Sequence, residues 1–259
     1  MSTHTLRDCT TMLRRNLLHA RRYPSLTLNL LLTPVMLLLL FVYVFGDVMS
    51  TGIGGANRTD YIAYLLPGLL LMTIGSTTIG TAVSVSNDMT EGIIARFRTM
   101  NIHRGSVLIG HVTGSVLQSV ASVILVAAVG AAIGFRSTNA TPLEWLAALG
   151  LLTLFALALT WIAVGMGLVS PNAEAASNNA IPLIFLPLIS SAFVPIHSMP
   201  GWFQPIAQYQ PFTPATETLR GLLLGTHIGN NGWLTITWSL ALTTLGYRWS
   251  TTIYNRDPK

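Results

Sequence analysis

Long apolar runs without a charged side chain constrain the fold of this chain more than any other feature. A helix needs about 20 mainly apolar residues to cross the hydrocarbon core of a bilayer. Six runs approach or exceed that length: residues 26–45, 61–84, 107–135, 145–169, 180–196 and 233–247, the last being short and rich in threonine. Because the runs are continuous rather than alternating, they favour helices over the strands of a membrane barrel. The sequence therefore predicts an all-α membrane protein with six transmembrane helices.

The scarcity and placement of charged residues agree with this class. Only 9% of the 259 residues are charged, against about 25% in soluble domains. Eleven of the 14 lysines and arginines lie in the amino-terminal tail, after the second run or at the carboxyl end, and the others are Arg58, Arg136 and Arg220. Basic residues collect on the cytoplasmic side of membrane proteins. We expect a plasma-membrane protein with both termini and residues 87–104 in the cytoplasm, and the net charge of +5 indicates no nucleic-acid partner.

The amino-terminal tail, residues 1–24, predicts a helix that lies on the membrane surface. Residues 6–22 place their apolar and arginine side chains on separate arcs of a helix, with only Asn16 and Leu18 breaking the division, and Pro24 ends it. Such a helix suits the cytoplasmic surface, where arginines face lipid phosphates or a partner protein.

Residues 198–225, between the fifth and sixth runs, predict a re-entrant region on the outer side. The segment is too interrupted by proline to span and too apolar for a solvated loop, so we expect two short packed helices. Thr213 resembles a helix cap before Pro214, with Glu217 near the helix start. The residues that mark this region are Trp202, Pro214, Glu217 and Arg220.

Hydroxyl side chains recur at helical spacing in the second run. They are Thr73, Thr77, Thr81 and Ser84, and residues three or four apart share a helix face. Two interpretations stay open. Either this face packs tightly on another helix, helped by small residues such as Gly75 and the Gly130–Gly134 pair, or it lines a translocation path. Further candidates for lining such a path are Phe185 and Phe193.

The chain lacks the residues of most catalytic and cofactor sites. None of the six runs contains Asp, Glu, Lys or Arg, which ion-coupled carriers usually need inside the membrane. His111, near the inner end of the third run, stands alone and indicates packing or an interfacial position. Lys259 is the only lysine, so no P-loop lysine is present. The lone Cys9 forms no internal disulfide. We expect no enzyme activity and no cofactor in this chain, and an energy source on another chain.

Three stretches carry a family resemblance. Residues 14–47 hold an arginine-rich entry into the first run and end in "YVFGD"; residues 64–111 include "NDMTEGIIARFRTMNIHRG"; residues 193–225 contain "MPGWFQPIAQYQPFTPATETLRG". Together they resemble the permease subunit of ABC exporters of the type 2 membrane family, most closely its daunorubicin-resistance branch. The family usually has a proline shortly after the second arginine, where this chain has Met100 and Asn101.

The resemblance implies a half-transporter without its own ATPase. Residues 25–259 would form one six-span permease domain that pairs with a second permease, identical or homologous. Each permease would dock on a cytoplasmic ATP-binding subunit, which holds ATP and Mg²⁺, through the tail helix and residues 87–104, named here the coupling segment. The implied ATPase contacts are Arg14, Arg15, Asp88, Glu91, Arg96, Phe97 and Arg98. Asp88 and Glu91 also have capping-box spacing, so they could begin a short helix.

Three functions are compatible with these patterns. The first is ATP-driven export of amphipathic small molecules, such as drugs or secondary metabolites. The second keeps the architecture but exports a lipid or lipid-linked glycan. The third is an ion-coupled carrier or channel, against which the lack of charge inside the runs argues. The daunorubicin-like stretches favour the first.

The predicted orientation can be tested by labelling in intact cells. In a chain from which Cys9 has been removed, Arg98→Cys should not react with a membrane-impermeant thiol reagent, because basic loops stay in the cytoplasm. Arg58→Cys, on the predicted outer side, is the matched control and should react. Reaction at position 98 from outside would contradict the orientation.

Overall fold

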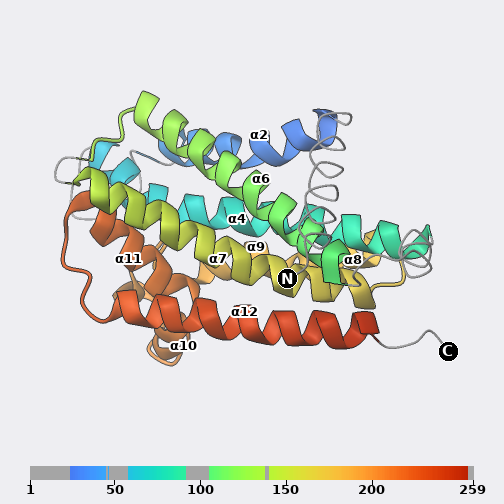
Figure 1. Cartoon of the computed structure of the whole chain (residues 1–259). Helices are drawn as coiled ribbons and strands as arrows, with labels where there is room; N and C mark the ends of the chain where they lie inside the picture. Colours follow the sequence, from blue (N-terminus) through green and yellow to red (C-terminus); the bar gives the residue numbers. More distant parts are fainter. Residues whose placement is uncertain (1–23, 45, 47–57, 92–104, 138–139, 256–259) are drawn as a thin grey trace.

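The structure, a computed structural model, describes residues 24–44, 46, 58–91, 105–137 and 140–255, and the regular secondary structure within these ranges is helical. In chain order the elements are α2 (Pro24–Tyr43), α4 (Arg58–Thr90), α6 (Gly105–Ala132), α7 (Pro142–Val169), α8 (Ala173–Ala180), α9 (Pro182–Phe185), η1 (Leu186–Ile189), η2 (Ile196–Ser198), α10 (Gln204–Tyr209), α11 (Phe212–Leu224) and α12 (Asn231–Asn255). The long helices α2, α4, α6, α7 and α12 lie side by side, and α10 and α11 pack at one end (Figure 1).

Three of the described helices are long and apolar enough to cross a membrane: Thr59–Thr90, Val107–Ala132 and Pro142–Val169. They correspond to the second, third and fourth predicted spans. Helices α2 and α12 have 20 and 25 residues, but α12 is less apolar and the apolar stretch described in α2 is only Leu32–Tyr43. The arrangement of six spans therefore stays a prediction.

The fifth predicted span, residues 180–196, is not a continuous helix. Its residues divide among the end of α8, the four-residue α9 and the 3₁₀ helix η1, and the backbone becomes extended at Ser190. Pro182 and Pro187 explain the breaks, because proline has no backbone N–H to donate and its ring clashes with the preceding turn. The prediction of one continuous helix, which rested on the length and apolarity of the run, is therefore wrong for this segment.

Helix α4 is the centre of the bundle. It contacts α2, α6, α7, α8 and α11, and Leu65, Leu66, Leu69 and Ile74 are fully buried within it. Close approach requires glycine at Gly75, where a methyl group would lie 2.5 Å from the carbonyl oxygen of Leu183. The predicted close contact at Gly75 is confirmed.

Helix α12 packs along α7 through small and hydroxyl side chains. Its buried residues are Thr235, Ser239, Gly246, Ser250 and Tyr254. Ser250 Oγ donates to the carbonyl oxygen of Trp161 at 3.0 Å, and Trp161 meets Tyr247 edge to face with ring centroids 5.0 Å apart. Small residues allow helix backbones to approach closely in a membrane. Among the threonines of the sixth run, Thr235 is buried, whereas Thr237 and Thr244 are exposed.

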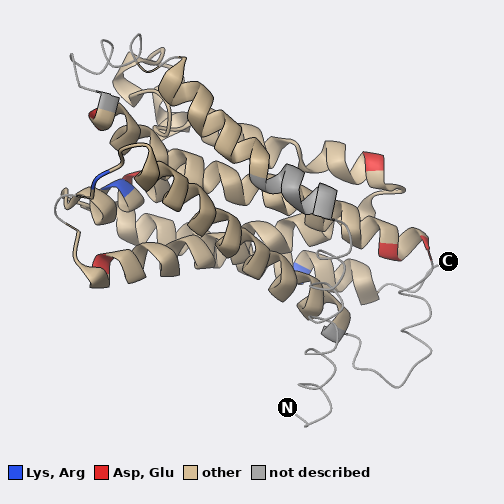
Figure 2. Ribbon diagram, turned by 90° about the horizontal axis from the view of Figure 1, so that it is seen from above, with Lys and Arg blue, Asp and Glu red and all other residues tan. Residues whose placement is uncertain are grey.

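The acidic side chains in the described ranges lie toward the two ends of the bundle, and its middle holds none (Figure 2). One end has Glu217 and Arg220, on α11. The other end has Asp88 and Glu91, where α4 finishes. Ion pairs between side chains of the described ranges can therefore form only near these two ends.

The contact between α7 and α12 can be tested with a single methyl group. A methyl group at Gly246 would lie 2.9 Å from the backbone N of Ile162 and 2.9 Å from the backbone C of Trp161. Gly246→Ala should therefore destabilise the detergent-solubilised protein by about 1–3 kcal/mol, as overpacking does. Gly150→Ala is the control, because its methyl group would meet nothing within 4 Å. Equal thermal unfolding of the two variants would contradict the packing.

Candidate functional site: a polar cluster between α4 and α11

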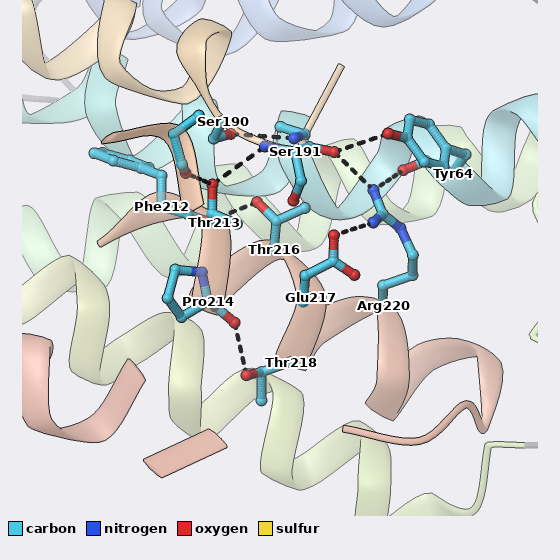
Figure 3. Close-up of polar contacts among 12 residues, drawn as sticks. Tyr64, Ser190, Ser191, Phe212, Thr213, Pro214, Thr216, Glu217, Thr218 and Arg220 are labelled. Carbon is cyan, nitrogen blue, oxygen red and sulfur yellow. Dashed lines mark hydrogen bonds and ion pairs between the residues drawn. The ribbon is translucent and has the colours of Figure 1, made fainter. Parts of the chain in front are cut away.

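Arg220 joins three segments that are far apart in the sequence (Figure 3). Its Nη1 donates to Glu217 Oε1 at 2.6 Å, within α11. Its Nη2 donates to the carbonyl oxygens of Tyr64, on α4, and Ser191, after η1, both at 3.1 Å. The guanidinium carbon also lies 4.1 Å from the centroid of the Tyr64 ring. A planar guanidinium suits this site because its donors point in several fixed directions while its face stacks on an aromatic ring.

Two further contacts hold the turn after η1 in place. Tyr64 Oη donates to the carbonyl oxygen of Ser191 at 3.0 Å. The backbone N–H of Ser191 donates to Thr213 Oγ1 at 3.2 Å, and the same hydroxyl donates to the carbonyl oxygen of Ala207. The backbone of this irregular turn is thereby satisfied by side chains of α4 and α11, as buried backbone requires.

The predicted cap of α11 is wrong. The helix begins at Phe212 without a side-chain cap, so Thr213 lies inside its first turn and bonds elsewhere. Pro214 is buried in that first turn, and Glu217 comes a turn later, where it pairs with Arg220 rather than with the helix start. The two short helices themselves, α10 and α11, are present as expected. Trp202, just before them, is 75% exposed and contacts Phe203 edge to face.

A cavity of about 440 Å³ lies beside the cluster. Its lining includes Tyr64, Ser191, Gln204, Gln208, Glu217 and Arg220. Arg220 Nε and Ser191 Oγ are buried and have no hydrogen-bond partner within the described part of the chain. Glu217 offsets the charge of Arg220, so the cluster as a whole is close to neutral. The arrangement can hold three segments together and offer hydrogen bonds to the cavity, but it pairs no nucleophile with a base.

The hydroxyl face of α4 lies against α6. Thr77 Oγ1 and Ser119 Oγ are 2.6 Å apart, and Thr81 contacts Ser115 in the same way one turn further on. Thr73 is fully buried and donates to the carbonyl oxygen of Leu69. Ser84, on the following turn, is half-buried.

The two phenylalanines predicted to line a path have different surroundings from each other. Phe185 is 58% exposed at the end of α9. Phe193 is half-buried and packs on Phe41 of α2, with ring centroids 5.2 Å apart. The candidate path residues therefore fall into separate surroundings.

At the opposite end of α4, Asp88 is buried and Glu91 is exposed. The capping box expected from these two residues is wrong, because Asp88 lies in the last turn of α4 and the N–H of Glu91 continues that turn to the carbonyl oxygen of Asn87. His111 of α6 is not alone either, since its Nε2 is 2.9 Å from Asp88 Oδ2. The other expected ATPase contacts, namely Arg14, Arg15, Arg96, Phe97 and Arg98, lie outside the described residues.

Sequence patterns missed two of these contacts. The carbonyl acceptors of Arg220 carry no side-chain signal, although the spacing of Glu217 and Arg220 is that of a helical ion pair. The pairing of Asp88 with His111 needed a longer α4 than the apolar run suggested. No group of three His, Cys, Asp or Glu residues that could hold a metal ion occurs within the described ranges.

Residues 7–224 match the family of ABC-2 type transporters, so the chain belongs to that family. It is accordingly a multi-pass membrane permease. Proteins of this family have no catalytic site and bind no cofactor, and the ATPase activity that drives them lies in a partner subunit.

Several curated proteins are similar to this chain. A daunorubicin resistance ABC transporter permease protein, DrrB1 of Streptomyces coeruleorubidus, is 29% identical over 220 residues, which are 83% of this chain and 75% of that protein. A probable doxorubicin resistance ABC transporter permease protein, DrrC of Mycobacterium tuberculosis, is 25% identical over 206 residues, 74% of this chain and 69% of that protein. ABC transporter G family member 20 of Dictyostelium discoideum is 23% identical over 179 residues, 66% of this chain and 23% of that protein.

The cluster predicts a specific loss of stability. Arg220→Ala removes one hydrogen-bond donor from the Glu217 carboxylate and from each of the carbonyl oxygens of Tyr64 and Ser191, so it should destabilise the purified protein by about 2–3 kcal/mol, the scale of a hydrogen bond to a charged group. Arg220→Lys keeps the charge but not the planar arrangement of donors, so its stability should lie between that of Arg220→Ala and that of the unsubstituted protein. Arg248→Ala removes an exposed arginine and serves as control. Unchanged unfolding of Arg220→Ala would contradict the assigned contacts.

Proposed function

We propose that this permease exports amphipathic small molecules, such as drugs or secondary metabolites, across the plasma membrane. The observation that carries the proposal is the similarity over 83% of the chain to a permease named for daunorubicin resistance. The relative named for doxorubicin resistance supports the same class of cargo. The energy would come from ATP hydrolysed by the partner subunit.

The orientation proposed for the bundle assigns its two ends. Tyr64 and Asp88 lie on the single helix α4, 24 residues or about 36 Å apart at 1.5 Å per residue. With the coupling segment and both termini in the cytoplasm, as the distribution of basic residues favours, the Arg220 cluster and its cavity lie at the outer end. We propose that the cluster keeps the outer end closed, and that its contacts rearrange when cargo leaves.

The partners follow from the same orientation. The permease would pair with a second permease, contact membrane lipid through its tail helix, and dock on the ATPase through Arg14, Arg15, Glu91, Arg96, Phe97 and Arg98. Asp88 is not in this set, because its carboxylate faces α6. The hydroxyl face of α4 stays the proposed path. In the structure α6 covers this face, since Thr77 and Ser119 are in contact.

Docking can be tested in the coupling segment. Phe97→Ala and Arg98→Glu should each weaken ATPase binding, because breaking a buried contact at an interface costs about 2–5 kcal/mol. Co-purification with the ATPase would measure the loss, with membrane insertion unchanged. Arg58→Glu, on the proposed outer side, is the matched control. Normal assembly of both coupling-segment variants would show that its charges serve only membrane orientation.

The class of cargo can be tested in cells that express the permease with its ATPase. They should accumulate less daunorubicin than cells expressing the ATPase alone, because export lowers the internal concentration. Equal drug accumulation, together with altered export of a lipid-linked glycan, would favour the alternative cargo instead.

A further inference from the structure

The buried pair of Asp88 and His111 is separate from the cluster around Arg220. His111 Nε2 lies 2.9 Å from Asp88 Oδ2, and the two side chains are 5% and 8% exposed, respectively. Within the described ranges, Asp88 is the only buried acidic residue and His111 the only buried histidine. Burying such groups is costly unless they are paired, so their retention in a chain with few charges calls for a role.

The position of the pair suggests that role. Asp88 is in the last turn of α4, and His111 is in the second turn of α6. The coupling segment, residues 87–104, joins the end of α4 to the start of α6 in the sequence. The hydrogen bond therefore joins the end of α4 to the start of α6 in space, and among the side-chain hydrogen bonds between these helices in the described ranges it is the nearest to these two helix ends.

The surroundings strengthen the contact. Val85 precedes Asp88 by three residues, and Leu108 precedes His111 by three, so each shares a helix face with its neighbour. Both belong to an apolar cluster that also includes Trp161 of α7 and Tyr254 of α12. A hydrogen bond in such a low-dielectric setting is stronger and more directional than one in water.

We propose that Asp88 and His111 are positioning residues that make α4 and α6 move as one unit when the ATPase displaces the coupling segment. The inference rests on the proposed function, since it assumes that ATP hydrolysis acts through this segment. Displacement of the segment then shifts both helices together. Through the continuous α4 the shift reaches Tyr64, whose carbonyl oxygen is held by Arg220. Without the bond, the segment can move while the helices stay in place.

The test measures ATP hydrolysis and daunorubicin transport in the same vesicles, reconstituted from the permease and its ATPase. His111→Phe keeps a ring but removes the hydrogen bond, and should lower transport per ATP hydrolysed about tenfold, within the range typical of residues that couple two sites. ATP hydrolysis and assembly should stay near those of the unsubstituted complex. His111→Gln keeps a donor and should restore most of the ratio. Thr113→Val, an exposed position two residues away on α6, is the control.

Two results would overturn the inference. One is an unchanged ratio of transport to ATP hydrolysis in His111→Phe. The other is a parallel loss of hydrolysis, transport and thermal stability, which would mean that the pair only stabilises the fold. If His111→Phe fails to assemble, the double variant Asp88→His with His111→Asp is used instead. It keeps a hydrogen bond between the two positions and should keep the ratio of transport to ATP hydrolysis. Failure of the proposed function is distinguishable, since the unsubstituted complex would then show no ATP-dependent transport.

Discussion

The burial of most of α4 inside the bundle is the constraint on which the rest of the structure depends. This helix has 33 residues, about 50 Å at 1.5 Å per residue, and it contacts α2, α6, α7, α8, α9 and α11. A helix in that position must satisfy every polar group within the protein. It does so through hydroxyl contacts with α6, the Arg220 cluster near its start and the pair of Asp88 with His111 near its end. Both ends of the bundle that carry charge are thus connected by one continuous helix.

Association between the helices relies on close packing more than on the exclusion of water, because lipid is as apolar as the side chains. The structure accordingly brings small residues to the contacts. Gly75 allows α4 to touch the backbone at Leu183, and Gly246 allows α12 to touch the backbone of α7. Hydroxyl pairs such as Thr218 and Thr235, 3.2 Å apart, add directional contacts between α11 and α12. Tight contacts of this kind switch between discrete arrangements more readily than they deform, which suits a transporter.

Much of the fold follows from the length of the apolar runs, because a run as long as residues 145–169 forms a helix in lipid. The fifth run shows the limit: its composition is apolar enough, but Pro182 and Pro187 break it, and only tertiary contacts decide where the chain goes next. The site was less predictable. The roles of Glu217 and Arg220 depend on carbonyl groups of Tyr64 and Ser191, which no spacing reveals. His111 gained its partner because α4 continues past the end of its apolar run, to Thr90.

We propose a permease that does no chemistry of its own and uses ATP hydrolysis by a partner subunit to drive export. The most direct measurement is daunorubicin uptake into inside-out vesicles that contain the purified permease, with and without its ATPase, ATP and an ionophore. The account predicts uptake that requires both chains and ATP and that persists when the ionophore removes ion gradients. Uptake by the permease alone, driven by an ion gradient and independent of ATP, would contradict it.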